Sequence, residues 1–125
     1  MGEPQRDPLP LLLVDVANVV GSRPDGWWRD RVGATRRVLA ALAPLTAEHQ
    51  VIAVLEGAAR AAAPAEETVS GIRVVHAAGS GDDALVGLAA RGSTVVTADR
   101  GLRARVVGLG ASVVGPGWLW SRLEG

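Results

Sequence analysis

The sequence has no cysteine, and this absence excludes disulfide bonds and thiolate-bound zinc. Phenylalanine, tyrosine and lysine are absent as well, so every permanently cationic side chain is an arginine and every aromatic side chain is a tryptophan. Thirteen acidic residues balance the thirteen arginines, and a net charge of zero provides no overall field that attracts nucleic acid. Any binding of phosphate groups therefore depends on a local group of arginines.

Long apolar runs are also missing from the sequence. No stretch approaches the roughly 18 residues that a membrane-spanning helix needs, and residues 1–10 are too polar and proline-rich for a signal peptide. We therefore expect a cytoplasmic protein without membrane contact. The 125 residues suit a single domain, which we place at residues 10–125, after a flexible N-terminal tail of residues 1–9 in which prolines disfavour regular structure.

Three short apolar segments each run directly into an acidic residue. A run without polar alternation is typical of a strand that is buried on both faces of a parallel sheet. The carboxyl ends of parallel strands meet at the edge of the sheet where ligands bind in open α/β folds. The three segments are Leu11–Val14 before Asp15, Val51–Leu55 before Glu56, and Thr94–Ala98 before Asp99.

The remaining segments alternate between strand and helix patterns. This alternation predicts right-handed crossovers and a three-layer α/β sandwich with a five-stranded parallel sheet. The alanine-rich residues 57–70 fit a short helix but carry no clear pattern. Further strands are expected at residues 72–76 and 111–114, helices at residues 26–43, 80–91, 100–109 and from Pro116 onward, and a loop at residues 21–26 with Asp25 as a helix cap.

The acids at the strand ends suggest a site for a divalent cation. Mg²⁺ binds oxygen ligands, usually one or two carboxylates together with waters and substrate phosphates. Carboxylates brought to one edge repel one another, so a cation would stabilise the group. Four acids from separate parts of the chain are candidates: Asp15, Glu56, Asp83 and Asp99.

Helix capping is the alternative explanation for these acids. Ser80 and Asp83 match the capping-box spacing, Asp99 directly precedes a predicted helix, and Asp15 could brace a turn. Glu56 has no evident cap to make. The sequence leaves both explanations open for each of the other acids.

The order of these motifs resembles the NYN branch of the PIN-like nuclease superfamily, in particular its YacP-like ribonucleases. The resemblance runs from about Leu11 to Val114. It rests on Leu-Leu-Val-Asp-x-x-Asn-Val, then a strand that ends in an acid, then Gly-Asp-Asp-Ala-Leu-Val, and then Val-Val-Thr-Ala-Asp-Arg. It implies the strand order 3-2-1-4-5 and a metal-dependent ribonuclease that hydrolyses RNA phosphodiester bonds.

The resemblance also implies roles for individual residues. Mg²⁺ or Mn²⁺ would activate a water molecule and stabilise the leaving oxygen, with RNA as the partner. The sequence leaves open whether the protein forms a homodimer or binds a small protein partner. The implied catalytic acids are Asp15, Asp83 and Asp99, and the metal ligands are Asp15, Glu56, Asp82, Asp83 and Asp99, with Glu56 at a position where the family often has Asp. The expected substrate contacts are Asn18, Thr97 and Arg100, the last because it is next to Asp99.

Three other functions compete with this hypothesis. Residues 79–84 match the G-x-G-x-x-G/A pattern of a Rossmann-type nucleotide-binding domain, although Asp82 and Asp83 would then face the pyrophosphate. A catalytically inactive PIN-like module for RNA or protein binding would keep the fold without the reaction. A nucleotide phosphohydrolase would use the same metal chemistry on a smaller substrate.

The four tryptophans are expected to contribute mainly to packing. Trp27 and Trp28 together would anchor a helix to the core. Trp118 and Trp120 lie two positions apart and cannot share one face of a helix, so we expect one of them to be exposed, where it could stack on a base or contact a partner.

Overall fold

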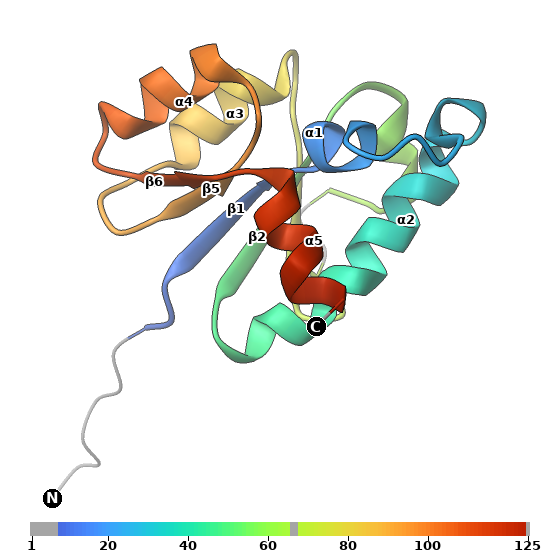
Figure 1. Ribbon diagram of the computed structural model, residues 1–125, viewed down its shortest axis with the longest axis horizontal. Helices are drawn as coiled ribbons and strands as arrows, with labels where there is room; N and C mark the ends of the chain where they lie inside the picture. The colour runs from blue at the N-terminus through green and yellow to red at the C-terminus, as the bar shows by residue number, and fades with distance from the viewer. Residues whose placement is uncertain (1–7, 66–67, 125) are drawn as a thin grey trace, which may run out of the picture.

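The computed structural model describes residues 8–65 and 68–124, and a six-stranded sheet lies at its centre (Figure 1). The strand order is β3-β4-β2-β1-β5-β6, and all neighbours are parallel except the antiparallel pair of β3 and β4. The five parallel strands thus have the order 3-2-1-4-5, which confirms the expected fold class. The strands are β1 Leu11–Asp15, β2 Gln50–Leu55, β3 Thr68–Val69, β4 Ile72–His76, β5 Thr94–Val96 and β6 Ser112–Val114.

Helices cover both faces of the sheet and complete the three layers (Figure 1). Helices α3 and α4 pack on one face, and α1, α2 and α5 pack on the other. No helix in the described ranges is long and apolar enough to cross a membrane. The α-helices are α1 Val16–Gly21, α2 Arg31–Leu42, α3 Gly81–Leu88, α4 Arg100–Val107 and α5 Pro116–Glu124, and the 3₁₀ helices are η1 Trp27–Arg29, η2 Ala43–Ala47 and η3 Gly57–Ala62.

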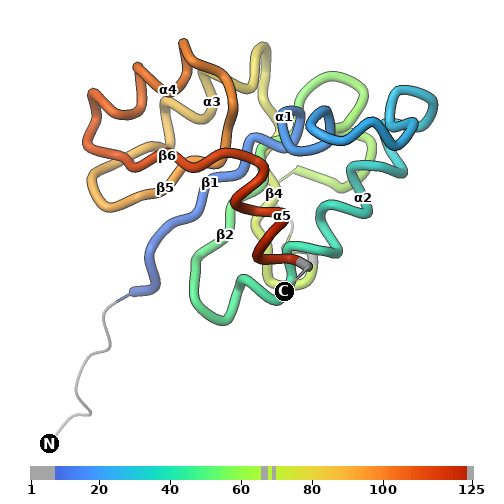
Figure 2. The backbone as a smooth tube through the Cα atoms, in the orientation of Figure 1, coloured from blue at the N-terminus to red at the C-terminus, as the bar shows by residue number. Residues whose placement is uncertain are grey.

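Strand β1 runs through the middle of the sheet, as the backbone trace shows (Figure 2). Leu12 and Val14 point into the core under α1 and α2, whereas Leu13 points into the core under α3 and α4. All three side chains have no exposed surface. Burial on both faces explains why this strand has no polar alternation and why its first polar residue, Asp15, marks the edge of the sheet.

The segment after β1 differs from the expectation in two ways. Helix α1 begins directly at Val16, so the loop expected at residues 21–26 follows a short helix rather than the strand. The helix expected over residues 26–43 is divided at Asp30, whose Oδ1 accepts a hydrogen bond from the Gly33 N–H at 2.9 Å. Asp30, and not Asp25, therefore caps α2, because η1 takes the residues that precede it.

The N-terminal tail expected at residues 1–9 lies largely outside the described residues, which begin at Pro8. The described part contacts the sheet. The Leu9 carbonyl accepts a hydrogen bond from the Gln50 side chain at 2.8 Å, and the Pro10 carbonyl accepts one from the Gln50 N–H at 2.9 Å. These bonds connect the chain to β2 before β1 begins.

The tryptophans differ in their environments. Trp27 is half-buried and packs against the core, whereas Trp28 is 54% exposed. Trp118 and Trp120 are both half-buried, so the expectation that one of them is exposed is wrong. The guanidinium of Arg122 lies over Trp118 and that of Arg23 lies over Trp120, at 4.7 and 4.0 Å from the ring centroids.

Candidate functional site at the carboxyl edge of the sheet

Asp15 is the last residue of β1 and is only 4% exposed. One of its carboxylate oxygens, Oδ2, accepts hydrogen bonds from the Asn18 amide nitrogen and from the Thr97 hydroxyl, both at 2.9 Å. The other oxygen, Oδ1, accepts from the Asn18 backbone N–H at 3.4 Å and so caps α1. The Asp15 carboxylate is therefore held from two sides, by the start of α1 and by the end of β5.

Asn18 and Thr97 use their remaining polar atoms within the protein. The side-chain oxygen of Asn18 accepts a hydrogen bond from the Ala98 N–H at 3.0 Å, and the Thr97 hydroxyl oxygen accepts one from the Asp99 N–H at 3.1 Å. Both residues were expected to contact substrate. Their hydrogen bonds join the end of β1 to the end of β5 and orient Asp15, and their contact with substrate stays a prediction.

Asp99 caps the next helix. Its Oδ1 accepts a hydrogen bond from the Leu102 N–H at 2.8 Å, and α4 begins at the following residue, Arg100. The capping explanation from the sequence is thus correct for Asp99. Asp15, for which the alternative is the bracing of a turn, caps helix α1. Arg100 is exposed beside this acid, on the first turn of α4.

Glu56 caps a helix that begins 25 residues later in the chain. It follows β2, and its Oε2 accepts a hydrogen bond from the N–H of Gly81, the first residue of α3. The Ser80 side chain makes no capping bond, so the capping box expected at residues 80–83 is wrong. A Cβ on residue 81 would lie 2.9 Å from Glu56 Oε2, so a side chain at this position would displace the Glu56 carboxylate.

The two acids on the first turn of α3, Asp82 and Asp83, have different environments. Asp83 is exposed and forms a salt bridge with Arg105 of α4 at 3.0 Å. Asp82 is half-buried, and its nearest charges include Asp99 and Glu56. The sequence predicts both acids as metal ligands and Asp83 as a catalytic acid; of the two, Asp82 is the more buried and interacts electrostatically with Asp99 and Glu56.

Four acids consequently lie near one another at this edge, and we call Asp15, Glu56, Asp82 and Asp99 the carboxylate group. Burial is the main cause that raises the pKa of Asp15; Glu56 and Asp82 raise it further, against the hydrogen bonds from Thr97 and Asn18. Burial likewise raises the pKa of Asp82 most, followed by Asp99 and Glu56, while Arg105 opposes the shift. These shifts show that the acids share one electrostatic environment.

The carboxylate group has the donor chemistry of a Mg²⁺ or Mn²⁺ site. Within the described ranges, no three Asp, Glu or His side chains lie close enough together to hold a metal ion as they stand. Mg²⁺ usually takes only one or two carboxylates and completes its coordination with water and phosphate. Asp15, held in place by its neighbours, and Asp82, which forms no hydrogen bond with the described residues, fit that smaller requirement.

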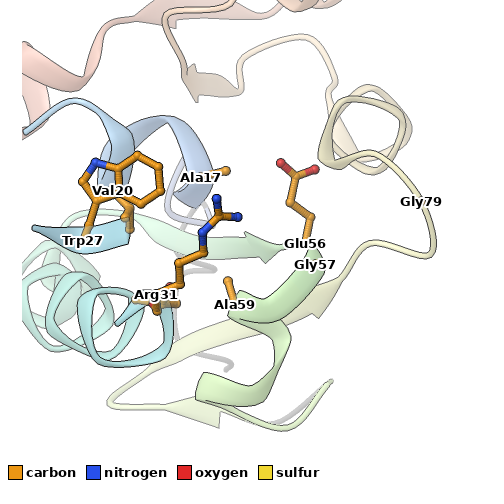
Figure 3. A pocket seen from close by; sticks show the side chains of 9 residues that line it. Ala17, Val20, Trp27, Arg31, Glu56, Gly57, Ala59 and Gly79 are labelled. Atoms are coloured by element: carbon orange, nitrogen blue, oxygen red, sulfur yellow. The ribbon is translucent and has the colours of Figure 1, made fainter. Parts of the chain in front are cut away.

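A cavity of about 390 Å³ opens on the α2 side of Glu56 (Figure 3). Trp27 and Arg31 face it from η1 and α2, and the Glu56 carboxylate lies across from them (Figure 3). Glu56 therefore belongs both to the carboxylate group and to the lining of this cavity. The contact of Arg31 with Trp27 could not be predicted from sequence spacing, because the two residues belong to different helices separated at Asp30.

The Rossmann-type alternative is not consistent with this geometry. A pyrophosphate in such a domain binds the backbone N–H groups where the helix begins. Here the Glu56 carboxylate accepts from the Gly81 N–H, and Asp82 occupies the first turn. The Glu56 carboxylate therefore occupies the position at the start of α3 that the pyrophosphate of a nucleotide would take.

Comparison with known proteins identifies both the fold and the family. Two crystal structures of Rae1 (YacP) from Bacillus subtilis, one of them of a mutant, are similar to this chain, with TM-scores of 0.74 for the mutant and 0.69 and sequence identities of 19% and 20%. Each comparison covers 93% of this chain, and 76% and 74% of the respective Rae1 chains. No curated protein matches the sequence. Residues 34–121 match the model of a family described as "Uncharacterized BCR, YaiI/YqxD family", and the chain belongs to this YaiI/YqxD family.

Proposed function

We propose that this protein is a metal-dependent ribonuclease of the NYN branch of the PIN-like superfamily, and that it hydrolyses RNA phosphodiester bonds at the carboxylate group. The observation that carries the proposal is Asp15, a buried acid whose pKa is raised by burial and by the nearby acids Glu56 and Asp82. Acids with raised pKa values that converge at a ligand-binding edge are typical of catalytic sites. The likeness in fold to Rae1 (YacP) supports the same class.

The residues of the site have separate tasks in this proposal. Asp15 and Asp82 hold Mg²⁺ or Mn²⁺, with Glu56 and Asp99 adding negative charge around it. When bound, the cation supplies an activated water and stabilises the charge on the leaving oxygen. Thr97 and Asn18 keep the Asp15 carboxylate in one orientation.

Two exposed charged side chains, those of Arg100 and Asp83, lie outside the carboxylate group. Arg100, beside Asp99, is available for RNA phosphates at the mouth of the site. Asp83, whose exposed carboxylate is paired with Arg105, is not needed to hold the cation in this proposal.

A cleavage assay on single-stranded RNA tests the proposal. We expect wild-type protein to cleave the RNA with MnCl₂ and to leave it intact with EDTA, and we expect Asp15→Asn to be inactive in both conditions. Asp83→Asn is the matched control and should retain activity. Intact RNA together with hydrolysis of nucleoside triphosphates would replace the proposal with a nucleotide phosphohydrolase.

A non-catalytic RNA-binding module is the second candidate, and one observation favours it. Asp15, Glu56 and Asp99 each accept a hydrogen bond at the start of a helix, so each acid also has a structural task. Under this alternative the wild-type protein would bind the RNA but never cleave it with Mn²⁺ or Mg²⁺. The same assay, combined with a binding measurement, separates the two candidates.

A further inference from the structure

We propose that the cavity beside Glu56 binds one nucleotide of a single-stranded RNA, with the base against Trp27 and a phosphate on Arg31. The inference deepens the proposed function and rests on it, since the subsite would feed the strand toward the carboxylate group. It assigns a binding role to two residues, Trp27 and Arg31, that lie outside every motif identified in the sequence.

The volume of the cavity suits a single nucleotide. Its volume of about 390 Å³ lies in the lower part of the range of small-molecule sites, about 300–1,000 Å³. The wall between its two ends is apolar and includes Ala17, Val20 and Ala59. Figure 3 shows the Trp27 ring and the Arg31 guanidinium on one side and the Glu56 carboxylate on the other.

Arg31 provides a positive charge that is not paired with any acid in residues 8–65 and 68–124. Its guanidinium lies 5.2 Å from the centroid of the Trp27 ring, and no described residue forms an ion pair with it. Arg31 and Glu56 line the same cavity without pairing with each other. Guanidinium groups bind phosphate through two parallel hydrogen bonds, so a phosphate is a suitable ligand for this end of the cavity.

Trp27 provides an aromatic surface beside that charge. Stacking of a base on an aromatic ring tolerates any base, and an adjacent arginine strengthens it, as proteins that bind single strands often show. Other Arg–Trp pairs occur in the described part of the chain, but the Trp27 pair shares its cavity with an acid of the carboxylate group. A strand bound here would reach the candidate cation site from the Glu56 side.

The neighbouring pair of Trp28 and Arg29 provides matched controls. The Arg29 guanidinium lies 6.0 Å from the centroid of the Trp28 ring, and neither residue lines the cavity. Arg29→Gln therefore removes a positive charge from the same segment without changing the proposed subsite. Trp28→Phe removes the indole but keeps an aromatic ring against Trp27, whose ring centroid lies 5.9 Å from that of Trp28.

The test is the affinity of a fluorescein-labelled uridine hexamer, measured by anisotropy in EDTA so that no metal-dependent cleavage takes place. We expect Trp27→Leu and Arg31→Gln each to weaken binding about fivefold or more, the lower end of the effect of losing one stacked base. The control variants should bind like wild type. Equal losses in both pairs, or no loss in the cavity pair, would overturn the subsite.

Two further measurements keep the test independent of folding and of catalysis. Trp27 contacts the core, so Trp27→Phe, which keeps an aromatic face, should retain most of the affinity, and circular dichroism should show that each variant folds. Cleavage of RNA with Mn²⁺ but unchanged hexamer binding in the cavity variants would contradict the subsite alone. Hexamer binding through Trp27 and Arg31 without cleavage would contradict the proposed nuclease instead.

Discussion

Asp15 combines burial with a set of acidic neighbours, and this combination opposes its ionisation. The folded protein binds the Asp15 proton more tightly than the unfolded chain does, because the pKa is raised on folding. The stability contributed by the protonated acid is present at low pH. It is lost as the pH rises from about 4, near the ordinary pKa of an aspartate, through the raised pKa of the folded state.

Replacement of this acid should therefore stabilise the protein at neutral pH. Asp15→Asn removes the buried charge, and asparagine is as good a helix cap as aspartate. We expect a higher melting temperature than wild type at pH 7–8 and a smaller difference near pH 4, measured by circular dichroism at constant ionic strength. A lower melting temperature at pH 8 would show that the hydrogen bonds to Asn18 and Thr97 outweigh the charge repulsion.

Asp82 and Asp83 are adjacent in sequence but should respond differently to the same substitution. Asp82→Asn is expected to weaken Mn²⁺ binding about tenfold or more, an effect seen even for residues that only support a metal ligand. Asp83→Asn breaks an exposed ion pair with Arg105 and should cost about 0.2–1 kcal/mol in stability with unchanged Mn²⁺ affinity. Calorimetric titration with Mn²⁺ and urea unfolding give the two values, and the reverse ranking of the Mn²⁺ affinities would return the role to Asp83.

At the scale of elements, the start of α3 depends on a side chain from the end of β2. Gly81→Ala would place a Cβ 2.9 Å from the Glu56 carboxylate and disturb the capping bond. We expect a loss of about 0.5–2 kcal/mol in unfolding free energy, the usual effect of losing a cap. Gly87→Ala on the same helix is the control. Its Cβ would meet nothing within 4 Å, so it should stabilise the helix by up to about 1 kcal/mol.

Urea unfolding of both variants tests this coupling between elements. A stabilised Gly81→Ala, similar to Gly87→Ala, would show that α3 begins without help from Glu56. A loss confined to Gly81→Ala would show that the β2 edge and the α3 start form one unit.

The parallel strands could be predicted from the sequence because a strand buried on both faces has apolar residues at consecutive positions. Leu12, Leu13 and Val14 are all fully buried, and an uninterrupted apolar run records that environment directly. The two-residue strand β3 could not be predicted, because it owes its existence to pairing with β4 across the turn at Ser70 and Gly71. A strand of two residues is too short to show the alternation of apolar and polar residues by which a strand is predicted.

The candidate site could be predicted in its location but not in its connections. The placement of Asp15 and Glu56 at strand ends followed from the apolar runs, whereas β5 ends at Val96, three residues before Asp99. The bond between Glu56 and Gly81 joins residues far apart in sequence, so no local spacing indicates it. The choice between Asp82 and Asp83 depended on the helical phase, which shifts by about 100° for each residue of error in the helix start.

At the scale of the whole molecule, the net charge of zero hides an uneven distribution. Acids gather at the carboxyl edge of the sheet, while Arg23, Arg31 and Arg122 lie over tryptophans. The acidic edge would attract a cation. A cation that binds only the folded protein raises the free energy of unfolding by mass action.

Addition of Mn²⁺ should raise the melting temperature of the wild-type protein. At a concentration 100 times the dissociation constant, the stabilisation is about 2.7 kcal/mol. EDTA should reverse the shift, and Asp15→Asn should show little of it when both proteins are compared in differential scanning fluorimetry. An equal shift in the two proteins would place the cation away from Asp15.

The contact between Glu56 and the Gly81 amide has a consequence for observing the site. An acid that turns toward an arriving cation releases the N–H it had accepted, so deuterium exchange at Gly81 should accelerate upon addition of Mn²⁺ while exchange within the central strands stays slow. A single backbone hydrogen would then report occupancy of the neighbouring carboxylates in solution, even for a variant that has lost all turnover.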